Sequence, residues 1–324
     1  MLLRLWPEGT KVKFMSFRMV ALIISIVAIA GSAFMLSTRG LNLGIDFAGG
    51  SVIEIVQPEG TTADDVRAAV TPLNLGDVAI NNARGTGADA VDLAVIRFET
   101  QQPREGEDVE SAQQNANNRV RAALAEAFPG VEIRSSAAVG PKVSGELFRS
   151  GVTALGVALL LMTIYITLRF QWQYALGAVS ALFHDVFITM GVFALTGFEF
   201  NLATIAALLT IVGYSMNDTV IVFDRVREEM RKYKKLEASQ VVDLAINATM
   251  SRTLLTSTTT LLALLSIFIF GGEVLRGMSF ALIFGVIVGT YSSIFVASTV
   301  LLMLPSLDRG DKPKREVEGF QGVG

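Results

Sequence analysis

Six long apolar segments constrain this chain more than any other feature of its sequence. They cover approximately residues 19–36, 151–168, 174–196, 202–223, 253–270 and 278–304. Each approaches or exceeds the roughly 17–25 residues that an α-helix needs to cross the hydrocarbon core of a bilayer. Only 18% of the 324 residues are charged, against about 25% in soluble domains. The sequence therefore predicts a polytopic α-helical membrane protein with six transmembrane helices.

The positions of lysine and arginine predict how these segments cross the membrane. Basic residues precede the first segment and follow the fourth and the sixth, whereas the turns at 197–201 and 271–277 carry at most one. Because short loops rich in Lys and Arg stay on the cytoplasmic side, we expect both termini to be cytoplasmic. The first apolar segment is longer than the core of a usual signal peptide, so we interpret it as an uncleaved signal-anchor.

A polar stretch between the first two segments predicts a separate domain outside the cytoplasm. Its pattern is strand, helix, strand, strand, helix, strand, over residues 51–57, 62–70, 77–82, 91–98, 108–128 and 131–135. That order is typical of an α+β ferredoxin-like unit. The expected division of the chain is residues 1–37 for the cytoplasmic N-terminus and first span, 38–149 for the periplasmic domain, 150–305 for the remaining bundle and 306–324 for a cytoplasmic tail.

Composition excludes several classes of function. The chain has no cysteine and one histidine, His184, so thiolate chemistry and a multi-histidine metal site are excluded. A net charge of −3 gives no argument for nucleic-acid binding. No phosphate-binding or dinucleotide-binding glycine motif occurs, so we expect neither a metal nor another cofactor. The carboxylates of the polar domain form no catalytic set, which favours a binding or coupling module over an enzyme. Energy for any work is then expected from an ion gradient or a partner.

Asp218, in the middle of the fourth apolar segment, is the strongest candidate for a functional residue. A carboxylate there costs roughly 2.5–3.5 kcal/mol on insertion scales, so a chain keeps it only if it is paired, hydrated or used. Arg252, directly before the fifth segment, is the expected partner of Asp218. Together, Asp218 and Arg252 predict a proton pathway. Other polar side chains that could extend this pathway are Tyr214, Ser215, Asn217, Thr219, Thr256 and Thr259.

Two further groups of residues lie in the third and sixth segments. His184 and Asp185 are adjacent, and the sequence leaves open whether they relay protons or form a hydrogen-bonded packing pair. Gly285, Gly289 and Ser292 place small residues along one helix face. Such a face permits close helix packing, and it could make room for the helix that carries Asp218.

Six motifs in order give the chain a family resemblance. They are GIDFAGG (44–50), VGPKVSGEL (139–147), HDV (184–186), NDTVIVFDRVRE (217–228), SRTLLTSTTTLL (251–262) and GTYSSIFVA (289–297). Together they closely resemble the SecF family, the smaller membrane subunits of bacterial SecDF protein-export complexes in the RND superfamily. The resemblance covers nearly the whole chain.

The resemblance implies half of an RND transporter in the bacterial inner membrane, paired with SecD. Its implied role is to couple the proton-motive force to late-stage export of unfolded preproteins from the SecYEG translocon, as a transport subunit rather than an enzyme. The essential acid of the family falls on Asp218, and its functional basic residue falls on Arg252. An acid on SecD has no counterpart in this chain, so the pathway is expected to be incomplete without the partner.

Three other functions are compatible with parts of the sequence. A half-size RND exporter of small hydrophobic molecules would share the architecture and the ion chemistry. An intramembrane aspartyl protease would use Asp185 and Asp218 as a dyad, but the residues around Asp218 lack the GxGD pattern of that class. A passive scaffold for the outer domain would leave the buried Asp218 unexplained.

Overall fold

The computed structural model describes residues 7, 10–84, 91–103 and 106–305. Its membrane part consists of η1 (Phe14–Phe17), α1 (Arg18–Thr38), α5 (Pro141–Arg169), α6 (Trp172–Thr196), α7 (Leu202–Lys232), α8 (Ala238–Phe270), α9 (Glu273–Tyr291), the π-helical turn η3 (Ser292–Val296) and α10 (Ala297–Met303). In this described part, six helices are long and apolar enough to cross a membrane, and α9, η3 and α10 together make the last of them. This confirms the six spans expected from the apolar segments.

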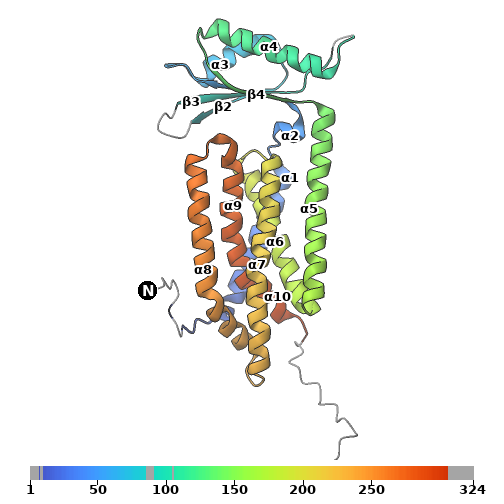
Figure 1. Cartoon of the computed structure of the whole chain (residues 1–324), viewed down its shortest axis with the longest axis vertical. Coiled ribbons are helices and arrows are strands. Elements are labelled where there is room, and N and C mark those ends of the chain that lie inside the picture. Colours follow the sequence, from blue (N-terminus) through green and yellow to red (C-terminus); the bar gives the residue numbers. More distant parts are fainter. Residues whose placement is uncertain (1–6, 8–9, 85–90, 104–105, 306–324) are drawn as a thin grey trace, which may run out of the picture.

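The long helices form a bundle, and the small domain lies at one end of it (Figure 1). The apolar parts of α6 and α7 are the most buried, so these two helices form the centre of the bundle. By contrast, α1, α5 and α8 expose large apolar side chains, among them Ile24, Leu160 and Leu262. Such surfaces suit contact with lipid, because each helix satisfies its own backbone hydrogen bonds.

The small domain is a four-stranded antiparallel sheet covered on one face by two helices (Figure 1). Its elements are α2 (Ile45–Ala48), β1 (Gly50–Val56), α3 (Ala63–Val70), η2 (Thr71–Leu73), β2 (Val78–Arg84), β3 (Asp92–Phe98), α4 (Val109–Ala127) and β4 (Ile133–Val139). The strand order β2-β3-β1-β4 is the ferredoxin-like one, which confirms the expected fold class. The core under α3 and α4 includes Ile53, Ile96 and Leu124, all fully buried.

Several boundaries differ from the sequence prediction; α8, for example, begins at Ala238 rather than at residue 253. β4 extends to Val139, beyond the predicted end at residue 135, because its small residues show no apolar alternation and are held in the sheet by pairing with β1. α5 begins at Pro141, directly after β4, so the expected division between residues 149 and 150 falls inside a helix. Proline is favoured at the first helical position, and the first turns of α5 are polar because they lie outside the apolar segment.

Candidate functional site: two buried carboxylates in the helix bundle

Asp218 lies in the middle of α7 and is 7% exposed. Its Oδ1 accepts a hydrogen bond from the hydroxyl of Thr253 on α8 at 2.6 Å, and its Oδ2 accepts one from the hydroxyl of Ser293 in η3 at 2.6 Å. Hydrogen bonds from hydroxyls to an ionised carboxylate are short and strong. The carboxyl group of Asp218 is therefore held by polar groups of two neighbouring elements, as intramembrane acids generally require.

A second carboxylate, that of Asp185 on α6, is fully buried. Its Oδ2 accepts hydrogen bonds from Ser215 on α7 at 2.5 Å and from Ser292 in η3 at 2.7 Å. Its Oδ1 lies 2.9 Å from Nδ1 of His184. The side chains of these two sequence neighbours thus meet, although neighbouring positions on a helix point about 100° apart. Asp185 and Asp218 each have their own donors, so they do not form the shared-proton dyad of an aspartyl protease.

The hydrogen bonds around His184 can be satisfied in both of its charge states. Nδ1 lies 2.9 Å from the carboxylate of Asp185, to which it can donate, and Nε2 lies 3.2 Å from the hydroxyl of Ser25 on α1. The hydroxyl of Ser25 also lies 3.1 Å from that of Tyr291, whose own proton goes to the carbonyl of Ala21 at 2.6 Å. Ser25 can therefore donate to a neutral imidazole, or accept from an imidazolium and donate to Tyr291 instead. One hydroxyl rotation accommodates an added proton.

The turn η3 joins the two carboxylates. Its first two residues are consecutive, yet Ser292 donates to Asp185 and Ser293 donates to Asp218. Consecutive residues point about 100° apart on a regular helix, and here the two directions lead to two different acids. π-helical turns such as η3 occur frequently at functional sites. A displacement of η3 would therefore change the surroundings of both acids at once.

Further hydroxyls continue the polar contact between α7, α8 and α9. Tyr214, one turn before Asp218, donates to Ser257 at 3.2 Å, and Ser257 lies 2.8 Å from the hydroxyl of Thr290. Thr219 is buried, and its hydroxyl has no hydrogen-bond partner among the described residues. Tyr214 and Ser215 were expected to extend the pathway from Asp218, and each bonds a different neighbour within the same polar interior.

Arg252 does not contact Asp218 in this conformation. It precedes Thr253, whose hydroxyl makes the contact, and its own side chain is exposed. Thr256 and Thr259, expected to extend the pathway, are likewise exposed, and they donate to carbonyls of their own helix. In this part of α8 the hydroxyl residues that face the interior are Thr253 and Ser257, each one position after a predicted residue. The side of a uniformly apolar helix that faces inward depends on packing, which the sequence pattern does not specify.

The exposed polar residues of α7 and α8 nevertheless lie together. The two helices are consecutive and antiparallel, and they meet through Asp218 and Thr253. For antiparallel helices, the residues that immediately precede two facing positions lie on the same flank of the pair. Asn217 and Arg252 are those residues, and both are exposed. We call this surface the polar flank; its exposed members are Thr210, Asn217, Arg252, Thr256 and Thr259.

Small residues on α9 bring η3 within reach of the acids. A Cβ added to Gly289 would lie 3.1 Å from Cβ of Ser215, and one added to Gly285 would overlap the side chain of Ile211. Both contacted residues belong to α7. The close approach of α9 to α7 therefore depends on glycine at these positions, and it places Ser292 against Asp185.

The motif GIDFAGG connects the small domain to the helix that carries Asp218. Its Asp46 accepts a hydrogen bond from the backbone N–H of Leu202, the first residue of α7, at 3.0 Å. A carboxylate is favoured at a helix N-terminus by the helix dipole. Nearby, the backbone N–H of Gly44 donates to Phe200 at 3.0 Å, and Arg97 on β3 forms an ion pair with Glu199. The domain and α7 are thus in direct contact.

Sequence reasoning missed three residues whose side chains hydrogen-bond those of predicted residues: Ser25, Thr253 and Ser257. Each is a hydroxyl residue inside an apolar segment, and that feature was their only signal. Because serine and threonine can bond their own helix backbone, isolated hydroxyls are weak evidence for a site.

The fold and the two acids define a polytopic membrane protein with ionisable groups at the centre of its bundle and a ferredoxin-like domain on one side. Two family models match the chain: "Protein export membrane protein SecD/SecF, C-terminal" over residues 119–306 and "SecD/SecF GG Motif" over residues 34–56. The chain therefore belongs to the SecD/SecF protein-export family, which confirms the resemblance of its motifs. The paired glycines of the second match are Gly49 and Gly50, both with positive φ.

Individual relatives agree with this assignment. The protein translocase subunit SecF of Rhodobacter capsulatus is 45% identical over 98% of this chain and 96% of its own length. The SecF subunit of Vibrio alginolyticus is 40% identical over 90% of this chain and 89% of its own length. The crystal structure of SecDF, a translocon-associated membrane protein from Thermus thermophilus, is 31% identical with a TM-score of 0.79. It matches 92% of this chain, which spans 39% of that solved chain.

Proposed function

We propose that this chain is an auxiliary subunit of a Sec-type preprotein translocase in the bacterial inner membrane. With SecD it couples the proton-motive force to late-stage export of unfolded preproteins that emerge from SecYEG. Both termini are then cytoplasmic and the ferredoxin-like domain is periplasmic. The proposal assigns transport rather than catalysis, and it is supported by SecF translocase subunits that match nearly the whole chain and by the SecDF crystal structure.

One observation carries the coupling: η3 donates to both buried carboxylates. An ionised Asp218 accepts from Ser293 and Thr253, whereas a protonated Asp218 must itself donate from one oxygen. One of those hydroxyls then has to reorient or move away. Protonation therefore changes the contact of α7 with η3 or with α8. One charge that crosses about 100 mV makes roughly 2.3 kcal/mol available for such a change.

The polar flank supports a partner in the membrane. Polar side chains such as Asn217 and Arg252 rarely face lipid, and they normally face other helices or water. Both are exposed in the isolated chain. Covering this flank with SecD would place its groups next to α7 and α8, close to Asp218. Arg252 remains the proposed basic residue of the pathway, acting from the side of the partner.

The deciding experiment is export of a model preprotein into membrane vesicles that contain wild type or Asp218→Asn, with and without an uncoupler. We expect the uncoupler-sensitive part of export to be lost in Asp218→Asn while the protein stays folded. The matched control is Asp224→Asn on the same helix, since the Asp224 side chain is 61% exposed. Uncoupler-sensitive export at the wild-type rate in Asp218→Asn would refute proton coupling through this residue.

An affinity pull-down separates this function from the exporter alternative. Recovery of SecD and SecYEG agrees with preprotein export. Recovery of an outer-membrane tunnel protein in their place would favour a half-size exporter of small hydrophobic molecules.

A further inference from the structure

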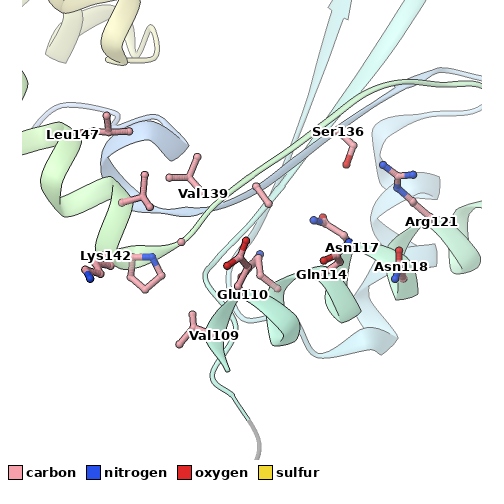
Figure 2. Close-up of a pocket in the computed structure, with 15 residues that line it drawn as sticks. Val109, Glu110, Gln114, Asn117, Asn118, Arg121, Ser136, Val139, Lys142 and Leu147 are labelled. Carbon is pink, nitrogen blue, oxygen red and sulfur yellow. The ribbon is translucent and has the colours of Figure 1, made fainter. Parts of the chain in front are cut away.

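The small domain contains a groove that lies outside the membrane. It runs between α4 and β4 and has a volume of about 680 Å³ (Figure 2). Gln114, Asn117, Asn118 and Arg121 line it from α4, and Ser136 and Ala138 line it from β4. Charged side chains of both signs also line it: Glu110 and Arg121 from α4, and Lys142 from the start of α5. The groove therefore offers amide and hydroxyl groups for hydrogen bonds together with charges of both signs.

One wall of the groove is the edge strand β4, and the part of β4 after Arg134 has little protection. β4 pairs with β1 on one side and is the last strand of the sheet. Folded proteins generally guard such an edge with charged residues, proline, a bulge or a covering element. The exposed Arg134 and a register shift in the pairing with β1 protect the start of β4. Residues 135–139 contain no charge and no proline, and Ser135, Ala137 and Ala138 are exposed. An extended chain could therefore pair with this edge.

The other wall holds a buried polar atom that has no partner. Asn117 is only 9% exposed, and its Oδ1 makes no hydrogen bond within the described residues. Its neighbour Gln113 is different, since it donates to Ser51 at 2.8 Å and accepts from the backbone N–H of Gln101 at 2.8 Å. An unsatisfied buried acceptor is unfavourable unless something donates to it. The side chain of Asn117 lies between α4 and the Ser136 side of β4 (Figure 2).

We propose that this groove binds an extended, unfolded polypeptide, which adds a strand to β4 and donates a main-chain N–H to Oδ1 of Asn117. This inference rests on the proposed function, because it identifies where the subunit holds its translocating substrate. Strand addition uses main-chain hydrogen bonds for affinity, so it tolerates many sequences. That tolerance suits preproteins, which share an unfolded backbone rather than a common side-chain motif.

The test uses the full-length chain, reconstituted with its partner subunit in lipid nanodiscs. The probe is a fluorescein-labelled, permanently unfolded peptide of mixed sequence, and the readout is fluorescence anisotropy. Asn117→Leu removes the unpartnered acceptor at similar volume, and we expect it to weaken binding by about fivefold or more. The same change at Asn115, which lies on α4 outside the groove, should leave binding unchanged. Equal binding by wild type and Asn117→Leu would overturn the proposal.

A second variant, Ala138→Glu, tests the groove even if Asn117→Leu fails to fold. Ala138→Glu changes an exposed residue in the groove, so the thermal unfolding temperature should stay constant while peptide binding falls. A photo-cross-linking phenylalanine analogue at position 138 should capture the peptide. Capture of the partner subunit or a second copy of this chain, with the peptide excluded, would show that another protein covers β4 and would refute the proposal.

This inference and the proposed function can fail separately. Peptide binding is measured at equilibrium without an ion gradient, whereas proton coupling is measured through Asp218→Asn. Loss of gradient-driven export in Asp218→Asn, together with wild-type binding by Asn117→Leu, would reject the groove alone. Binding at the groove with export unaffected in Asp218→Asn would reject proton coupling alone.

Discussion

The two buried acids differ in how completely their surroundings enclose them. Asp185 is fully buried and contacts three donors, from His184, Ser215 and Ser292. Asp218 contacts two donors, keeps 7% exposure and follows Asn217 on the polar flank. Proton exchange needs a route to water or to another titratable group. Asp218 is therefore better placed than Asp185 to exchange a proton, and the carboxyl group of Asp185 is held by more hydrogen bonds.

The tautomer of His184 is a prediction at the level of a single residue. Because Nδ1 lies 2.9 Å from the carboxylate of Asp185, we expect Nδ1 to carry a ring proton and to donate it to that carboxylate. Histidine occurs once in the chain, so nitrogen-15 labelling of histidine gives one unambiguous signal in solid-state NMR. We expect a protonated Nδ1 in wild type and loss of that preference in Asp185→Asn. Ser266→Ala, at an exposed hydroxyl, is the control. An unprotonated Nδ1 in wild type would contradict the assignment.

Sequence could identify the acids but not their partners. Asp218, Asp185 and His184 are conspicuous because each interrupts an apolar segment. The choice between Arg252 and Thr253 as the contact of Asp218 depends on a helix rotation of about 100°. Apolar residues surround both positions, so the sequence pattern contains no preferred face. The polar domain was easier to predict, because alternation and an N-cap such as Thr62 mark its elements.

At the scale of elements, η3 is the feature that sequence did not reveal. GTYSSIFVA was expected to be part of one continuous span with small residues for packing. The structure instead inserts a π-helical turn at Ser292–Val296, and its first two serines contact two different acids. No residue type specifically encodes a π-helical turn.

Double-mutant cycles test whether η3 contacts the acids as described. Ser293→Ala combined with Asp218→Ala should show a coupling free energy of about 0.5–3 kcal/mol, because the two residues share a hydrogen bond. Ser293→Ala combined with Asp185→Ala should be nearly additive. The pattern should reverse for Ser292→Ala. Unfolding in mixed detergent micelles measures these free energies. Equal coupling of Ser293 to both acids would contradict the division of contacts within η3.

The helix caps of the small domain predict a dependence on pH. Hydrogen bonds from the backbone N–H and the side chain of Thr62 lower the pKa of Asp65, and those from Ser111 lower the pKa of Asp108. A lowered folded-state pKa stabilises the fold fully above the unfolded pKa of about 3.9, and this stabilisation is lost as the pH falls through the folded value. The first turns of α3 and α4 should therefore lose protection below about pH 4.

Hydrogen–deuterium exchange, corrected for the intrinsic effect of pH, measures this loss of protection. Thr62→Ala should remove the pH dependence at the start of α3, because it deletes the hydroxyl that bonds Asp65. The start of α4 is the internal control, since its cap is formed by Asp108 and Ser111. Protection of α3 that stays constant from about pH 5 to about pH 3 would contradict a role for the ionised cap.

At the scale of the whole molecule, the membrane site and the outer domain are connected through α7. Asp46, from the segment that enters the sheet, bonds the N-terminus of the helix whose middle carries Asp218. A rigid helix transmits a shift at one end to the other, and the ion pair of Arg97 with Glu199 adds a second contact. This physical continuity is what a proton-driven movement of the domain requires, and it depends on contacts that are distant in sequence.

The polar flank gives the last prediction, which concerns the assembled complex. The chain has no cysteine, so a single introduced cysteine is a unique site for cross-linking. Asn217→Cys should form a cross-link to SecD in membranes that contain a library of single-cysteine SecD variants, because Asn217 is exposed beside Asp218 on α7. Leu160→Cys on α5 is the matched control: it is 59% exposed on an apolar surface, and we expect lipid to cover it.

Electrophoresis of the cross-linked membranes gives the readout, and Arg252→Cys should reproduce the Asn217→Cys pattern, since both residues lie on one flank of the α7–α8 pair. If Leu160→Cys cross-links to SecD while Asn217→Cys and Arg252→Cys do not, the partner covers α5 instead. Asn217 and Arg252 would then face lipid, which intramembrane polar residues avoid. The pathway through Asp218 would in that case need a route that excludes SecD.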